Sequence, residues 1–188
     1  MERDVAENMY ELLAKKYGMS LEQAKSNSRN VEQMAAEVGL NYQFDTMILT
    51  NTFDAHRLTM LAKSQGLMQE MTERLLRAYF TESKHIGDYA TLTELAVEVG
   101  LNRDEVAAML ASDDMSDEVR ADQQEAASIG VRSVPFFLIN RKYSLTGAQP
   151  TDVFVQALQQ VYSQDGPYEL DASEGMVCDE NGCEIPKK

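Results

Sequence analysis

Apolar residues recur every three or four positions along most of the chain, which is the spacing of one face of an α-helix. A first stripe stops before Gly18. Ser20 is a favourable N-cap for a second helix, and Gly39 supplies the left-handed residue that ends it. The two stripes consist of Val5, Met9, Leu12 and Leu13, and of Leu21, Ala24, Val31, Ala35 and Val38. The pattern therefore predicts two amphipathic helices near the start of the chain.

Helical spacing continues as far as Gly130. One helix is expected from about Thr52 to Ser64, and another passes through Val119 and ends at Gly130. Between them lies a stripe made of Leu67, Met71, Leu75, Tyr79 and Phe80. Two capping-box spacings, each expected to open a short helix, are Thr91 with Glu94 and Asn102 with Glu105. The first two-thirds of the chain should be entirely helical.

The pattern changes after Gly130. The run VPFFLI is short, apolar and bounded by Pro135 and by NRK, which is typical of a buried strand followed by a turn. The segment YSLTG can form its hairpin partner, and Pro150 stands where a last helix should start. From about Ser163 the chain is acidic and glycine-rich, and we expect a mobile tail. The predicted fold class is α+β, mostly helical.

Composition and charge exclude several classes of function. The 188 residues have 44% hydrophobic and 26% charged residues, an ordinary globular balance, and the net charge is −14. Such an acidic surface repels phosphate backbones and anionic lipids, so neither nucleic acid nor a membrane is an expected partner. The charged, amphipathic start lacks the basic and apolar regions of a secretory signal, which favours a cytoplasmic protein.

Two cysteines offer redox chemistry. Cys178 and Cys183 flank an Asn-Gly turn in VCDENGCEI, and a tight turn could bring the two thiols within reach of a disulfide. The acids beside them should raise the pKa of both thiols and slow their attack. A redox pair and two inert thiols are both compatible with this pattern. Without nearby histidines the pair lacks the four ligands of a zinc site, and no cofactor is predicted.

Other candidate features have ordinary structural explanations. Ala96, Gly100 and Val106 have helix-turn-helix spacing, but Asp104 and Glu105 would face DNA phosphates, so a pair of packed helices is the better interpretation. His56 and His85 each stand alone, and a solvated or hydrogen-bonded histidine is the default for both. Methionines on the helical stripes, expected mainly to fill the core, include Met9, Met34, Met68 and Met71.

One long segment carries a family resemblance. The residues ASIGVRSVPFFLINRKYSLTGAQPTDVFVQAL closely resemble the C-terminal part of DsbA-family thioredoxin-fold proteins, in particular the FrnE-like and 2-hydroxychromene-2-carboxylate isomerase-like branch. Upstream, NTFDAHRLTMLAKSQG resembles a segment of the helical insertion in that family. The matching positions of the C-terminal block are Gly130, Val131, Val134, Pro135, Gly147, Ala148, Gln149 and Pro150. The resemblance runs from about Arg3 to Tyr162.

The resemblance implies a DsbA-like thioredoxin fold with a helical insertion. It divides the chain into a helical insertion region (1–130), a strand-strand-helix part (131–163) and an acidic tail with the cysteine pair (164–188). Relatives begin with a βαβ unit that contains Cys-x-x-Cys, and we expect that unit to be missing here. A fragment, a shortened gene and a diverged protein all fit this expectation.

The resemblance also implies a function and a set of site residues. The implied activity is thiol-disulfide exchange or isomerisation, weak or absent in this chain, with Cys178 and Cys183 as the redox pair. Val134 and Pro135, joined by a cis bond, and His56 would bind a thiol or disulfide substrate, either a polypeptide or glutathione. The alternative is a non-catalytic binding or chaperone-like helical module. An exposed sheet edge would allow a homodimer.

Overall fold

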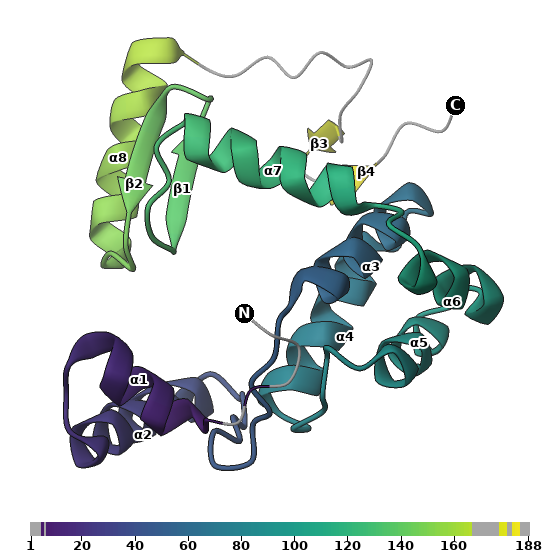
Figure 1. The fold of residues 1–188 in the computed structure, drawn as a ribbon. Helices are drawn as coiled ribbons and strands as arrows, with labels where there is room; N and C mark the ends of the chain where they lie inside the picture. Colours follow the sequence, from purple (N-terminus) through teal and green to yellow (C-terminus); the bar gives the residue numbers. More distant parts are fainter. Residues whose placement is uncertain (1–4, 6, 167–176, 180–181, 185–188) are drawn as a thin grey trace. The chain divides into compact units, whose positions relative to one another are not determined.

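The computed structural model describes residue 5, residues 7–166, and the backbone of residues 177–179 and 182–184. The chain forms two compact units, Met1–Glu125 and Ala126–Lys188. Figure 1 shows the order of the elements, with the helical first unit in purple to teal and the second in green to yellow. Within the described residues, none of the helices combines the length and the apolar character needed to cross a membrane.

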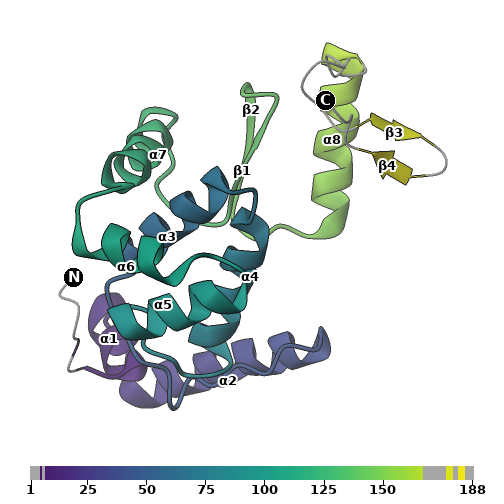
Figure 2. The same cartoon turned by 90° about the vertical axis from the view of Figure 1, so that its right-hand side faces the viewer.

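The first unit consists of helices. Their bounds are α1 (Met9–Tyr17), α2 (Leu21–Glu37), α3 (Phe53–Ser64), α4 (Met68–Phe80), α5 (Tyr89–Glu98), α6 (Arg103–Ala111) and α7 (Ser116–Ser128), the last of which crosses the division between the units. Figure 2 shows α3 to α6 gathered into one group of packed helices. This is the all-helical region that the apolar spacing predicts.

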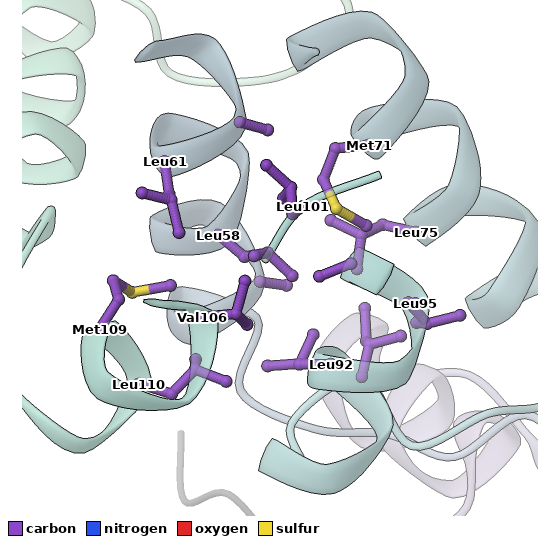
Figure 3. Packing of buried hydrophobic residues seen from close by; sticks show 14 of the residues in the cluster. Leu58, Leu61, Met71, Leu75, Leu92, Leu95, Leu101, Val106, Met109 and Leu110 are labelled. Carbon is purple, nitrogen blue, oxygen red and sulfur yellow. The ribbon is translucent and has the colours of Figure 1, made fainter. Parts of the chain in front are cut away.

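The main core lies among helices α3 to α6. Its most deeply buried large side chains are Leu58, Met71, Leu92, Leu95, Val106 and Leu110, which converge in Figure 3. Each buried aliphatic side chain of this size contributes about 1.5–3 kcal/mol. The helix-turn-helix spacing is accounted for here, because Ala96 and Val106 are buried in this core and Gly100 has a φ of 98°.

A second, smaller core joins α1 and α2 to the loop that follows them. Its buried members are Met9, Tyr10, Ala24, Phe44 and Leu49. The hydroxyl of Tyr10 donates a hydrogen bond of 2.6 Å to Asp45, and burial together with that carboxylate raises the pKa of Tyr10 to about 12. This core therefore fixes α1 against the segment that leads into α3.

Several predicted helix ends are confirmed, and one is wrong. Gly18 and Gly39 have positive φ angles, and Ser20 forms a reciprocal capping box with Gln23. The box predicted at Thr91 does not open a helix. Asp88 is the N-cap of α5, and its side chain accepts the N–H of Thr91. Tyr89 and Ala90 extend the helix toward the N-terminus, so the earlier of two competing caps is used.

The α2 stripe is not covered as its spacing suggests. Ala24 and Ala35 are buried, but Leu21, Val31 and Val38 are exposed, Val38 by 74%. Two methionines expected in the core, Met34 and Met68, are also exposed. Met9 and Met71 are buried as predicted. An apolar stripe shows that a helix has one apolar face, but it does not determine whether another element covers that face.

The second unit contains the predicted hairpin and the last helix. Strand β1 (Phe136–Ile139) pairs antiparallel with β2 (Tyr143–Thr146), and α8 (Thr151–Asp165) follows Pro150. The strand is less buried than predicted, because Phe137 and Leu138 are both exposed. Within the described residues β1 and β2 form a two-stranded sheet, so no third strand pairs with β1.

Most of the C-terminal segment predicted to be a mobile tail lies outside the described residues, so its mobility stays a prediction. Helix α8 continues to Asp165, beyond the predicted boundary at Ser163. Farther along, β3 (Val177–Asp179) and β4 (Gly182–Glu184) pair antiparallel. The turn signal was thus a correct guide to a hairpin.

Candidate functional site

The entrance to β1 is exposed. The Val134–Pro135 peptide bond is cis, and the side chain of Val134 is 86% exposed. The strand ladder starts one residue later, where Phe136 faces Thr146. Val134 and Pro135, two of the three residues predicted to bind substrate, therefore lie outside the ladder, and both are exposed.

Residues after β2 hold this entrance in place. The carbonyl of Pro135 accepts the N–H of Gly147 at 2.8 Å, and Gly147 has a φ of 84° that favours glycine. The side-chain amide of Gln149 donates to the carbonyl of Thr146 at 2.9 Å. The residues of the GAQP block thus fix the open end of the hairpin just before α8 starts.

The hairpin is also attached to α8. The rings of Phe137 and Phe154 meet edge to face with centroids 4.8 Å apart. At the other end, the ammonium of Lys142 lies 2.8 Å from the carboxylate of Asp165. That contact raises the pKa of Lys142 and lowers the pKa of Asp165. Both groups are exposed, so the ion pair mainly orients the turn and adds little stability.

The two cysteines face each other across β3 and β4. Cys178 is the register partner of Cys183, between the pairs Val177 with Glu184 and Asp179 with Gly182. Cα atoms of directly opposed residues in an antiparallel pair are about 4.5–5.5 Å apart, within the range of about 4.4–6.8 Å that a disulfide spans. The side chains of both cysteines lie outside the described residues, so the predicted redox pair stays a prediction.

His56 lies in the first turn of α3 and lines two hollows. The first is polar, has a volume of about 530 Å³, and is lined by Asn51, Thr52, Phe53, Asp54, His56, Arg120 and Gln123. The second is apolar, has a volume of about 410 Å³, and lies between α3 and α4. Sequence reasoning selected His56 but missed Arg120, which stands 64 residues later and carries no motif.

Arg57, the neighbour of His56, is buried and fully engaged. Its guanidinium forms an ion pair with Asp54 at 2.8 Å. It also donates to three backbone carbonyls, those of Met109, Ser112 and Asp114, at 2.5–2.8 Å. The residue therefore joins α3 to the end of α6 and the loop before α7. The available signal in the sequence was a charged residue directly before an apolar one, and the structure shows that both Leu58 and nearby Ala55 are buried.

This architecture is similar to that of known proteins. The family model for the DSBA-like thioredoxin domain matches residues 4–159. This chain belongs to the DSBA-like thioredoxin domain family. The crystal structure of a probable DsbA oxidoreductase from Streptomyces coelicolor is 39% identical and superimposes with a TM-score of 0.79. That likeness covers 96% of this chain and 77% of the other.

A curated relative is known from Bacillus subtilis. The uncharacterized protein YwbO is 29% identical over 131 residues, which cover 69% of this chain. The match spans 65% of the length of the Bacillus protein, slightly less than two-thirds. The comparisons confirm the predicted DsbA-like fold.

The predicted site residues of this DsbA-like chain fall in both units. His56 belongs to the first unit, and Val134, Pro135, Cys178 and Cys183 belong to the second. Within the second unit the structure opposes the two cysteines and exposes the β1 entrance. Within the first unit it places His56 beside Arg120 on the wall of the polar hollow.

Proposed function

We propose that this DsbA-family chain carries out slow thiol-disulfide exchange through Cys178 and Cys183. The register of β3 and β4, which opposes the two cysteines, is the observation that carries this proposal. Family membership supports the reaction type, and the Streptomyces neighbour is described as an oxidoreductase. The FrnE-like branch is the part of the family that the sequence motifs favour.

The exchange takes two balanced steps. One cysteine thiolate attacks a sulfur of the substrate disulfide, which forms a mixed disulfide and releases one substrate thiolate. The second cysteine thiolate then attacks the protein sulfur of the mixed disulfide and releases the other substrate thiolate. The substrate gains two electrons, and Cys178 and Cys183 become a disulfide. An external dithiol returns the pair to its reduced form.

The rate should be low because the acidic residues next to both cysteines in the sequence disfavour a thiolate. Reactive thiols in this chemistry are stabilised as thiolates by a helix N-terminus or a nearby cation. Cys178 and Cys183 lie on short strands among Asp179, Glu180 and Glu184, and the sequence contains no other cysteine. The exposed residue Val134, which precedes Pro135, is the proposed binding edge for an extended disulfide substrate.

The test is the product that forms with oxidised glutathione, measured by intact mass. The wild-type chain should first gain glutathione and then lose it, ending two hydrogens lighter with an internal disulfide. Cys178→Ser and Cys183→Ser, each lacking the resolving thiol, should retain one glutathione. A wild-type chain that keeps two glutathiones would show independent thiols and would overturn the proposal.

A binding module without catalysis is the second candidate, and the apolar hollow between α3 and α4 favours it. In that case the double variant Cys178→Ser, Cys183→Ser would retain every function of the chain. A thiol oxidoreductase would lose its activity in the same variant, so one comparison separates the two candidates.

The proposed partners are thiol or disulfide substrates and a second copy of the chain. In the described residues the β1–β2 sheet has two strands, and its outer edges have unpaired backbone groups. Such an edge favours pairing with another strand. We propose that two copies pair through the outer edge of β1.

A further inference from the structure

Two of the hollows in the first unit share lining residues. Thr52 and His56 line both the polar hollow and the apolar hollow. The two hollows therefore lie next to each other at the first turn of α3. A surface that is polar on one side of His56 and apolar on the other fits a ligand with two chemically different ends.

The apolar hollow has a volume of about 410 Å³, and within the described part of the chain its wall remains open. Its wall combines Ala55 and Thr59 of α3 with residues from α4 and the loop after it: Met68, Thr72, Leu75, Leu76, Tyr79, Phe80 and Ile86. Leu76 is 48% exposed and Met68 is also exposed. Covering such side chains with hydrocarbon is favourable by roughly 25 cal/mol for each Å² removed from water.

The polar side contains one cation whose charge is not balanced. The carboxylate of Asp54 is paired with Arg57. Arg120 lies over the ring of Phe53, with 5.1 Å between the guanidinium carbon and the ring centroid. Among the described residues Arg120 forms no ion pair. The contact with the Phe53 ring does not neutralise the guanidinium charge, so its N–H groups can donate to an anion.

From this arrangement we infer that the first unit binds a small amphiphilic carboxylate. The hydrocarbon body occupies the hollow between α3 and α4, and the carboxylate accepts hydrogen bonds from Arg120 and His56. The net charge of −14 penalises every negative charge that approaches the chain, so a head with one charge is favoured over a phosphate. This site would be separate from the thiol chemistry proposed above and does not depend on it.

Methyl NMR of the whole chain, labelled with ¹³C at the methionine methyl groups, tests this inference. Decanoate is the probe, used below the concentration at which it forms micelles. The Met68 resonance should shift in a saturable way, while the exposed Met34 on α2 and the core residue Met109 should stay in place. Acetate, which has the carboxylate head without the hydrocarbon body, should shift none of these three methionine resonances. An unmoved Met68 would overturn the inference.

Two variants separate the contributions of head and body. Arg120→Gln should weaken decanoate binding by about fivefold, as expected for an exposed ion pair, and should leave decanol binding within about twofold. Leu76→Glu brings a carboxylate to the apolar wall and should weaken both ligands by at least about tenfold. Val38→Glu is the matched control, because Val38, the C-cap of α2, is exposed and lines neither hollow.

The result would be contradicted by either of two outcomes. If Arg120→Gln weakened the binding of decanoate and decanol equally, the carboxylate would not be bound by Arg120. Equal weakening by Leu76→Glu and Val38→Glu would show general adsorption of a surfactant. The same titration on the Cys178→Ser, Cys183→Ser variant should give the wild-type affinity, so failure of the thiol proposal leaves this result unaffected.

Discussion

Replacement of Arg57 by methionine should destabilise the first unit more than any exposed substitution. Arg57 is 3% exposed, and methionine fills much of the same space without the charge. The substitution leaves the Asp54 carboxylate without its ion-pair partner, at a site where that side chain is 17% exposed. It also removes the donors to the carbonyls of Met109, Ser112 and Asp114.

The expected cost follows from these contacts. Breaking a buried ion pair by removing one partner costs about 3–5 kcal/mol. Asp54 is partly solvated and has a further interaction in the structure, so the lower end of that range applies. We predict a loss of about 3 kcal/mol, a large part of the roughly 5–15 kcal/mol that stabilises a typical domain.

Urea unfolding followed by circular dichroism measures this loss, and hydrogen exchange locates it. Arg57→Met should shift the helical transition to lower urea and accelerate exchange at residues 109–116. Arg103→Met on the exposed start of α6 is the control and should stay within about 0.5 kcal/mol of wild type. A loss below about 1 kcal/mol for Arg57→Met would refute the role of Arg57 in joining α3 to the α6–α7 loop.

Three further predictions concern the α5 cap, a tight loop and the sheet edge. Hydrogen bonds from Thr91 lower the pKa of Asp88, so the carboxylate stabilises the fold above about pH 4 and this contribution is lost as the pH falls through the lowered pKa. Asp88→Ala should therefore cost about 1 kcal/mol at neutral pH and less in acid, and a cost that grows in acid would contradict this. Gly87→Ala should cost about 1–3 kcal/mol in urea unfolding, because the new Cβ would overlap Oγ1 of Thr50. Combining it with Thr50→Ala should cost less than the sum of the single changes, whereas simple additivity would exclude the overlap. Sedimentation velocity at micromolar concentration should show a dimer, and the substitution Leu138→Pro in β1 should weaken it. A stable wild-type monomer would count against edge pairing.

The local elements could be predicted from the sequence because their causes are local. Gly18 and Ser20 mark a helix end and a helix start within three residues, and both are confirmed. The hairpin was predicted because an apolar run ends at a turn. Asn140 and Arg141, which form that turn, have φ angles near 50°, and asparagine tolerates this conformation better than most residues.

The functional surface could not be predicted because its parts are distant in sequence. Arg57 finds its carbonyl partners 52 to 57 residues later, beyond the reach of any helical pattern. His56 acquires meaning only when α7 brings Arg120 to the same hollow. The exposed Val31 and Val38 show the converse, since periodicity identifies an apolar face before anything determines what covers it.

Reduction of insulin by a dithiol, followed as turbidity, is the decisive measurement for thiol exchange at Cys178 and Cys183. The wild-type chain should raise the rate only slightly above that of the dithiol alone, because the acidic residues beside the two cysteines in the sequence disfavour a thiolate. The Cys178→Ser, Cys183→Ser variant should remove this increment completely. Rapid turnover by the wild-type chain would contradict the slow exchange, and an increment that survives in the double variant would show that the chemistry does not occur at these thiols.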